Sequence, residues 1–141
     1  MQAEVFLDTA SAIVLSSPHD QFHARATELA DQLEPSGTRL VTTRAVLLAI
    51  GNALSKQRYR QAAGQLLDSL EADPTVDMVS LSEPLYARAL QLYRERPDKE
   101  WGLTDCVSFL VMRDRGLTEA LTTDEHFQQA GFRALLREGT P

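Results

Sequence analysis

The sequence has a single cysteine and no long apolar run, and both shortages narrow the class of protein. Cys106 alone cannot form an intrachain disulfide, which is typical of a protein in a reducing compartment. No apolar stretch approaches the roughly 18–20 residues that a membrane-spanning helix needs. The start MQAEVFLD lacks the basic residues and the apolar segment of a signal peptide. We therefore expect a cytoplasmic protein that has no membrane partner.

Basic residues and common catalytic signatures are also scarce. The formal net charge is −6, which argues against a protein that coats nucleic acid by bulk electrostatics. A nuclease is still compatible with this charge, because a bound divalent ion reverses the local sign of a carboxylate cluster. No glycine-rich turn follows the first apolar segment, which argues against a doubly wound domain that binds a small molecule. Nothing in the sequence resembles a serine or cysteine catalytic triad.

What the sequence does contain is an alternation of strand-like and helix-like segments. An apolar content of 43% over 141 residues is enough for the core of one domain, and no repeat or linker divides the chain. We therefore expect a single domain over residues 1–141. Strands are expected over residues 3–8, 38–43, 76–81, 118–124 and 132–136. Helices are expected over residues 9–17, 19–34, 44–56, 58–71, 83–93, 103–116 and 125–131. This order predicts an α/β protein, a three-layer α/β/α sandwich with a central, mainly parallel sheet of four or five strands.

Several helix ends are predicted from single residues. The expected N-caps are Thr9 or Ser11, Thr42 or Thr43, Ser82 and Thr104. Pro35 with Gly37 should end the second helix, and Gly116 should end the helix that contains Cys106. The helix over 44–56 is apolar nearly all round, so we expect it to be buried.

Three aspartates stand at positions where a site would form. Asp8 and Asp124 each directly follow an apolar strand, and Asp105 lies in the first turn of a helix. If the first and fourth strands are neighbours, the three side chains meet at the carboxyl edge of the sheet. Such carboxylates repel one another unless a cation compensates, and Mg²⁺ or Mn²⁺ is the natural partner of oxygen ligands. Taken singly, each acid is also explained by helix capping or by the helix dipole.

The segments that carry these acids resemble a known family. FLDTA, TTRAVLLAIGNALS and EWGLTDCVSFLVMRDRGLTEALTTDEHFQQAGF occur in order and at the spacing of the PIN domain family. The likeness is to the bacterial group that includes VapC-type toxins of toxin–antitoxin pairs, and it covers essentially the whole chain. It implies an Mg²⁺- or Mn²⁺-dependent endoribonuclease that hydrolyses RNA phosphodiesters. It also implies that Asp8, Asp105 and Asp124 are the catalytic metal ligands, with an antitoxin as a protein partner and a homodimer as the assembly.

One position departs from the family pattern. The family usually has a glutamate in a stretch like VLLEIGNAL, whereas this chain has Ala49 there. The resemblance therefore implies a site with at most three of its four acids and with weaker metal binding. Reduced ribonuclease activity is one reading, and an inactive PIN module that binds RNA or a protein partner is the other. Asn52, one turn further along the same helix, offers an amide oxygen but no charge.

Other polar residues have weaker claims. By resemblance, Thr9 and either Thr122 or Thr123 orient water or phosphate oxygens. Arg44, at the start of the helix over 44–56, is the basic residue best placed to contact substrate. His19 and His23 have an i, i+4 spacing that suits zinc, but Asp20 is the only further ligand nearby. His126 is expected to pack at a helix start.

Overall fold

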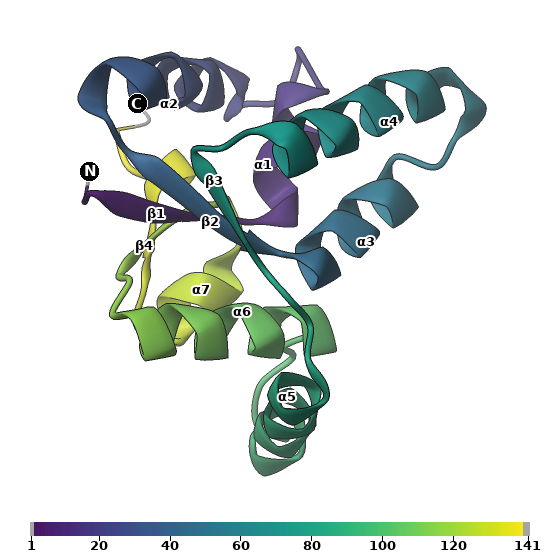
Figure 1. The fold of residues 1–141 in the computed structure, drawn as a ribbon. Coiled ribbons are helices and arrows are strands. Elements are labelled where there is room, and N and C mark those ends of the chain that lie inside the picture. The colour runs from purple at the N-terminus through teal and green to yellow at the C-terminus, as the bar shows by residue number, and fades with distance from the viewer. Residues whose placement is uncertain (1, 140–141) are drawn as a thin grey trace.

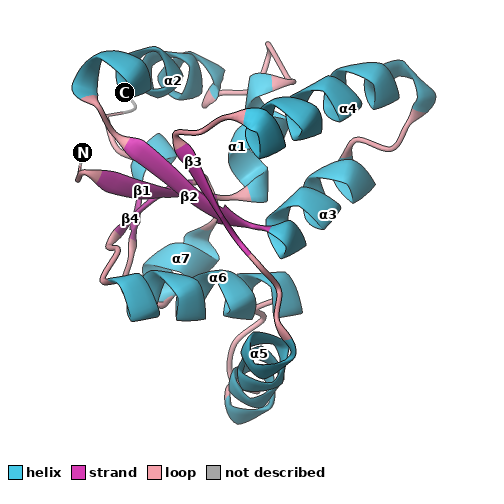
Figure 2. Cartoon of the chain, in the orientation of Figure 1, coloured by secondary structure: helices cyan, strands magenta, loops and turns pink. Residues whose placement is uncertain are grey.

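A five-stranded, wholly parallel sheet forms the middle layer of the computed structural model, which describes residues 2–139 (Figures 1 and 2). The strands, in the spatial order β3-β2-β1-β4-β5, are β1 (Glu4–Leu7), β2 (Arg39–Thr43), β3 (Val76–Val79), β4 (Glu119–Leu121) and β5 (Arg133–Ala134). The helices are α1 (Thr9–Leu15), α2 (His23–Ser36), α3 (Arg44–Ala53), α4 (Gln57–Ala72), α5 (Glu83–Glu95), α6 (Leu103–Arg115) and α7 (Glu125–Gln129). The predicted three-layer α/β/α class is confirmed.

The helices divide between the two faces of the sheet. The connections through α1 to α4 cover one face, and α6 and α7 lie against the other, with α5 packed outside α6 (Figure 1). The chain winds outward from β1 to β3 and then returns to the far side of β1 as β4. The order of strands therefore reverses between β1 and β4, which is where ligands bind in open parallel sheets.

β1 is the central strand and sets the register of the sheet around it. Phe6 pairs with Val41 on one side and with Ala120 on the other, and all three residues are fully buried. A strand that is buried on both faces is usually a continuous apolar run, and Val5, Phe6 and Leu7 form such a run in β1. The residues that follow β1 and β4 consequently leave the sheet side by side at its carboxyl edge.

An aromatic group holds α6 and α7 together beneath that edge. The Phe109 ring of α6 meets the Trp101 ring at 5.0 Å and the Phe127 ring at 4.9 Å, both edge-on. Phe109 and Phe127 are fully buried. Edge-to-face contacts of this kind add to the free energy of burial, so the relative position of the two helices is well determined.

The structure corrects several local predictions about helix starts and strand lengths. Asp8, rather than Thr9 or Ser11, is the N-cap of α1, and Gly102, rather than Thr104, precedes α6. β5 is only two residues long, because residues 135–137 form a 3-10 helix. α2 begins only at His23 and includes Pro35 in its last turn before Gly37 ends it. The predicted caps Thr43 and Ser82 and the stop at Gly116 are confirmed.

The prediction that residues 44–56 form a helix buried on all sides is wrong at one face. α3 ends at Ala53, and the side chain of Leu48 is 66% exposed. Leu81 and Tyr86, on the segment that follows β3, are also large apolar residues that remain exposed. α3 therefore presents an apolar face to solvent beside the start of α5. Among the described residues, we find no helix with the length and apolarity needed to cross a bilayer.

Candidate active site

Asp8 leaves the end of β1 and is the most buried of the three predicted acids. Its side chain is 5% exposed, and its backbone N–H donates to the carbonyl of Leu121 on β4 at 3.3 Å. The Thr122 hydroxyl donates to Asp8 Oδ2 at 2.7 Å. Burial raises the pKa of Asp8 to about 6, against the lowering effect of the Thr122 hydrogen bond, and the nearby Asp105 and Asp124 charges raise it further.

Asp124 leaves the end of β4 three residues after Leu121 and begins α7. Its backbone N–H donates to the Thr122 hydroxyl at 3.0 Å, and its Oδ1 accepts the backbone N–H of His126 at 2.8 Å. The second contact is an ordinary N-cap, which satisfies one of the free N–H groups at the start of a helix. Thr122 thus joins the two strand-end acids: it donates to Asp8 and accepts from Asp124.

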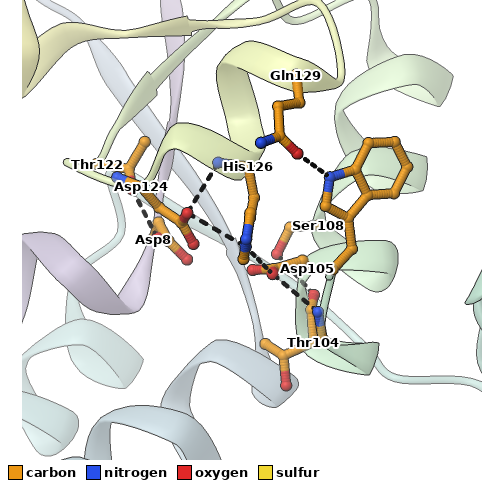
Figure 3. Close-up of polar contacts among 10 residues, drawn as sticks. Asp8, Thr104, Asp105, Ser108, Thr122, Asp124, His126 and Gln129 are labelled. Carbon is orange, nitrogen blue, oxygen red and sulfur yellow. Dashed lines mark hydrogen bonds and ion pairs between the residues drawn. The ribbon is translucent and has the colours of Figure 1, made fainter. Parts of the chain in front are cut away.

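Asp105 approaches the same edge from the first turn of α6. Its Oδ2 accepts the backbone N–H of Gly102 at 3.0 Å, which fixes the carboxylate relative to the helix start. Burial raises the pKa of Asp105, and the charge of Asp124 adds to this, against hydrogen bonds from Gly102 and His126. The predicted convergence of the three acids is therefore present in the structure (Figure 3). That they bind metal and act in catalysis stays a prediction.

His126 is the residue that sequence reasoning missed. Its Nδ1 lies 3.1 Å from Asp105 Oδ2 and 3.3 Å from Asp124 Oδ1, so the ring stands between two of the acids (Figure 3). Among the described residues, Asp105, Asp124 and His126 are the one group of three whose ligand-type atoms all lie within 4.8 Å of one another. Asp8 lies outside this tightest group. The signal in the sequence that could have identified His126 is its position two residues after Asp124, at the start of a short helix.

Ala49 lines a hollow beside the acids. The hollow has a volume of about 270 Å³ and lies between α3, the segment after β3 and the start of α6, where Thr104 lines it next to Asp105. Asn52 lines the same hollow, as its spacing of three residues from Ala49 predicts. Exposed Leu48 and Tyr86 make much of its wall apolar. A longer side chain at position 49 would enter this hollow, which Leu103 and Thr104 of α6 also line.

The remaining predicted residues have mixed outcomes. The Thr9 hydroxyl is buried and has no hydrogen-bond partner among the described residues. Thr122, not Thr123, is the threonine that contacts the acids, because adjacent residues at the end of a strand point in opposite directions. The guanidinium of Arg44 forms an ion pair with Glu71, with Nε 2.9 Å from Oε1. A role of Arg44 in substrate contact stays a prediction.

The other candidate ligands do not assemble. The His23 ring contacts the backbone carbonyl of Val14 at 3.0 Å, and no metal-type group that includes His19 or His23 occurs within residues 2–139. Cys106 is buried, and burial raises the pKa of its thiol, which suits an inert core residue.

The donor set fits a small divalent cation. Its tightest part consists of carboxylate oxygens of Asp105 and Asp124 and the imidazole nitrogen of His126. The carboxylate of Asp8 lies near them, at the edge where the parallel strands end. The raised pKa values of Asp8 and Asp105 have burial as their main cause; the charge of Asp124 raises both further, and the charge of Asp105 also raises that of Asp8. A cation bound among these side chains would offset the cost of burying the carboxylates and the repulsion between them, because it stabilises the ionised form of each acid.

Comparison with known proteins agrees with this architecture. The crystal structure of VapC20 from Mycobacterium tuberculosis, described as a Sarcin-Ricin loop cleaving toxin, superposes with a TM-score of 0.79. The two sequences are 24% identical, and the match covers 92% of this chain and 97% of VapC20. At that identity the likeness shows the fold alone. A comparison with curated proteins found no match.

The family itself is identified from the sequence pattern. The PIN domain family matches residues 5–133, which include all of β1 except Glu4, the whole of β4 and all three aspartates. The match thus spans nearly the whole chain and the complete carboxyl edge at which the acids meet. The chain belongs to the PIN domain family.

Proposed function

We propose that this chain is a divalent-metal-dependent endoribonuclease of the VapC toxin type, acting in the cytoplasm as a single PIN domain over residues 1–141. One observation carries the proposal. In a chain of the PIN family, Asp8, Asp105 and Asp124 converge at the carboxyl edge of the sheet, where strand order reverses. Holding three carboxylates together, with Asp8 buried and Asp105 and Asp124 partly buried, is unfavourable without a counter-charge, and a bound cation provides the compensation.

Each side chain has a separate task in this proposal. Asp8, Asp105 and Asp124 hold Mg²⁺ or Mn²⁺, and the Thr122 hydroxyl fixes the orientation of Asp8. A divalent cation at such a site neutralises phosphodiester charge and makes an attacking water more acidic. The hydroxyl of Thr9, directly after Asp8, is buried and has no hydrogen-bond partner among the described residues, so we assign it to a bound water. RNA approaches from the open carboxyl edge of the sheet.

The likeness to VapC20 supports RNA as the substrate and a toxin–antitoxin pair as the setting. That toxin cleaves the Sarcin-Ricin loop, so a structured RNA hairpin is the first substrate to assay. An antitoxin would cover the edge that holds the acids, with a basic side chain entering between them. The exposed apolar residues Leu48, Leu81 and Tyr86 provide a surface for that partner or for a second copy of the chain.

The test is RNA cleavage under defined metal conditions. The purified chain is incubated with a Sarcin-Ricin loop hairpin and with a linear RNA, in Mg²⁺, in Mn²⁺ and in a chelator. We expect cleavage with either metal, none with the chelator, and none for Asp105→Asn. Glu100→Gln is the matched control, because Glu100 is an exposed acid in the loop before α6 and should not matter. Cleavage that persists in the chelator would contradict the proposal.

A second candidate function is an inactive PIN module that binds RNA or a protein. The observation that favours it is Ala49, which replaces the family glutamate and leaves a hollow beside the acids. An RNA-binding assay and an RNA-cleavage assay together distinguish the two candidate functions. A module that only binds would retain RNA without cutting it in any metal, and its affinity would be unchanged by Asp105→Asn.

A further inference from the structure

His126 occupies a position that helix capping does not require. The N-cap of α7 is the carboxylate of Asp124, which accepts the backbone N–H of His126 at 2.8 Å. The cap is therefore complete without the imidazole, and most substitutions of the ring would leave it intact. The side chain nevertheless turns toward the acids and reaches a carboxylate from a different element, Asp105 of α6, at 3.1 Å.

The distances around Nδ1 match those between neighbouring ligands of one cation. Bond lengths of roughly 2.0–2.2 Å place adjacent ligand atoms about 3.0–3.5 Å apart around a tetrahedral or octahedral ion. Nδ1 lies 3.1 Å from Asp105 Oδ2 and 3.3 Å from Asp124 Oδ1. Nδ1 thus lies at ligand-to-ligand spacing from each carboxylate, and the three ligand atoms all lie within 4.8 Å of one another; Figure 3 shows the ring between the two carboxylates.

The ring can present that nitrogen to an ion after one change of tautomer. Without a bound ion, Nδ1 carries the proton and donates to Asp105 Oδ2 at 3.1 Å, because a carboxylate oxygen can only accept. The side chain of His126 is 29% exposed, so Nε2 can carry the proton on the solvent side when Nδ1 binds an ion. Its surroundings are oxygen atoms from two helix starts, one at Asp105 and one at Asp124, each already anchored by a backbone N–H. Anchored carboxylates and an adjacent ring nitrogen form a site that needs little rearrangement to accept an ion.

Because position 49 is an alanine, a nitrogen ligand from His126 would matter more to metal binding in this chain. The family glutamate would add a fourth carboxylate, whereas here the hollow at Ala49 contributes none. We propose that His126 is a metal ligand of this chain, binding through Nδ1 beside Asp105 and Asp124, and that it shifts metal preference from Mg²⁺ toward Mn²⁺ and Zn²⁺. Imidazole suits these ions, while Mg²⁺ favours an all-oxygen shell. The inference rests on the proposed metal-dependent function and names a ligand outside the acid set.

Binding of Mn²⁺ alone tests this without any RNA assay. Pulsed electron paramagnetic resonance of the Mn²⁺-loaded chain should show coupling to an imidazole nitrogen. The coupling should vanish in His126→Ala. It should persist in His19→Ala, which removes an exposed histidine from the loop before α2. Calorimetry should show that His126→Ala weakens Mn²⁺ binding by at least about tenfold and Mg²⁺ binding by less. Circular dichroism without metal checks that the variant folds.

The outcomes distinguish this inference from the proposed function. Mn²⁺ binding without nitrogen coupling, and with equal affinity in His126→Ala, would overturn the histidine ligand while leaving the carboxylate site intact. A chain that binds no Mn²⁺ would overturn both. The nitrogen coupling is measured on the unaltered chain, so the decision does not depend on the stability of the variant.

Discussion

The Thr122 hydroxyl donates a 2.7 Å hydrogen bond to Oδ2 of Asp8 and thereby links the ends of β4 and β1. The same oxygen accepts the backbone N–H of Asp124 at 3.0 Å. Both strand-end acids therefore depend on one fully buried side chain for their orientation. A threonine is suited to this task, because its hydroxyl donates and accepts at once.

Thr122→Val should weaken the site while keeping the shape of the side chain. It removes the hydroxyl donor to Asp8, which keeps only the backbone N–H of Thr9, and it leaves the Asp124 N–H without an acceptor, at a cost of about 1–3 kcal/mol in the free energy of unfolding. Mn²⁺ affinity should fall by about tenfold or more, since the oriented carboxylate is lost. Calorimetric titration measures this, and Thr123→Val is the matched control. Equal affinities for both variants would refute the role of Thr122.

The raised pKa of Asp8 predicts a pH-dependent stability. Below pH 4 the carboxyl is protonated in both the folded and the unfolded chain. Between pH 4 and about 6 the unfolded chain releases the proton and the folded chain retains it, so the free energy of unfolding falls as pH rises. The loss approaches about 3 kcal/mol at pH 7.

Asp8→Asn removes that loss and should be more stable than the unaltered chain at pH 7 but not at pH 4. Urea denaturation at a series of pH values measures the difference between the two proteins. Taking the difference cancels the titration of groups that both proteins share. A difference that stays constant from pH 4 to 7 would show that Asp8 titrates normally in the folded state.

Ala49→Glu should restore the acid that the family pattern contains. The hollow of about 270 Å³ leaves room for the longer side chain, so the fold should persist. An added carboxylate ligand should raise Mg²⁺ affinity by about tenfold or more and increase RNA cleavage. Ala53→Glu, on the exposed end of the same helix, is the control for an added charge. If both variants behave alike, position 49 does not belong to the site.

Phe109 should be the most sensitive core position near the acids. It is fully buried and packs edge-on against Trp101 and Phe127, which join α6 to α7. Phe109→Ala should lower the free energy of unfolding by about 3–5 kcal/mol. Tyr93→Ala, at a half-exposed position of α5, should cost less than about 1 kcal/mol. Urea denaturation compares the two, and similar costs would contradict this account of the core.

The sequence predicted the architecture and the three acids because both depend on local patterns. Apolar runs that end in Asp8 and Asp124 identify buried strands and their carboxyl ends, and helical periodicity identifies the connections. The resulting alternation leaves few topologies, and the parallel pairing of β1 with β4 is among them.

The errors concern features that depend on tertiary packing. His126 gains its contacts only because α7 packs next to the start of α6, which no local pattern reveals. Thr122 and Thr123 are adjacent, and which of their hydroxyls faces Asp8 depends on the register of β4 beside β1. Leu48 belongs to an apolar helix, yet no element among residues 2–139 covers its face.

The most direct test is a crystal of the unaltered chain soaked in Mn²⁺ and measured for anomalous scattering. The account predicts one strong peak at the carboxyl edge of the sheet, within bonding distance of Asp105 and Asp124 and adjacent to Asp8. A crystal that holds Mn²⁺ only elsewhere, or none at saturating concentration, would contradict a metal centre at these aspartates.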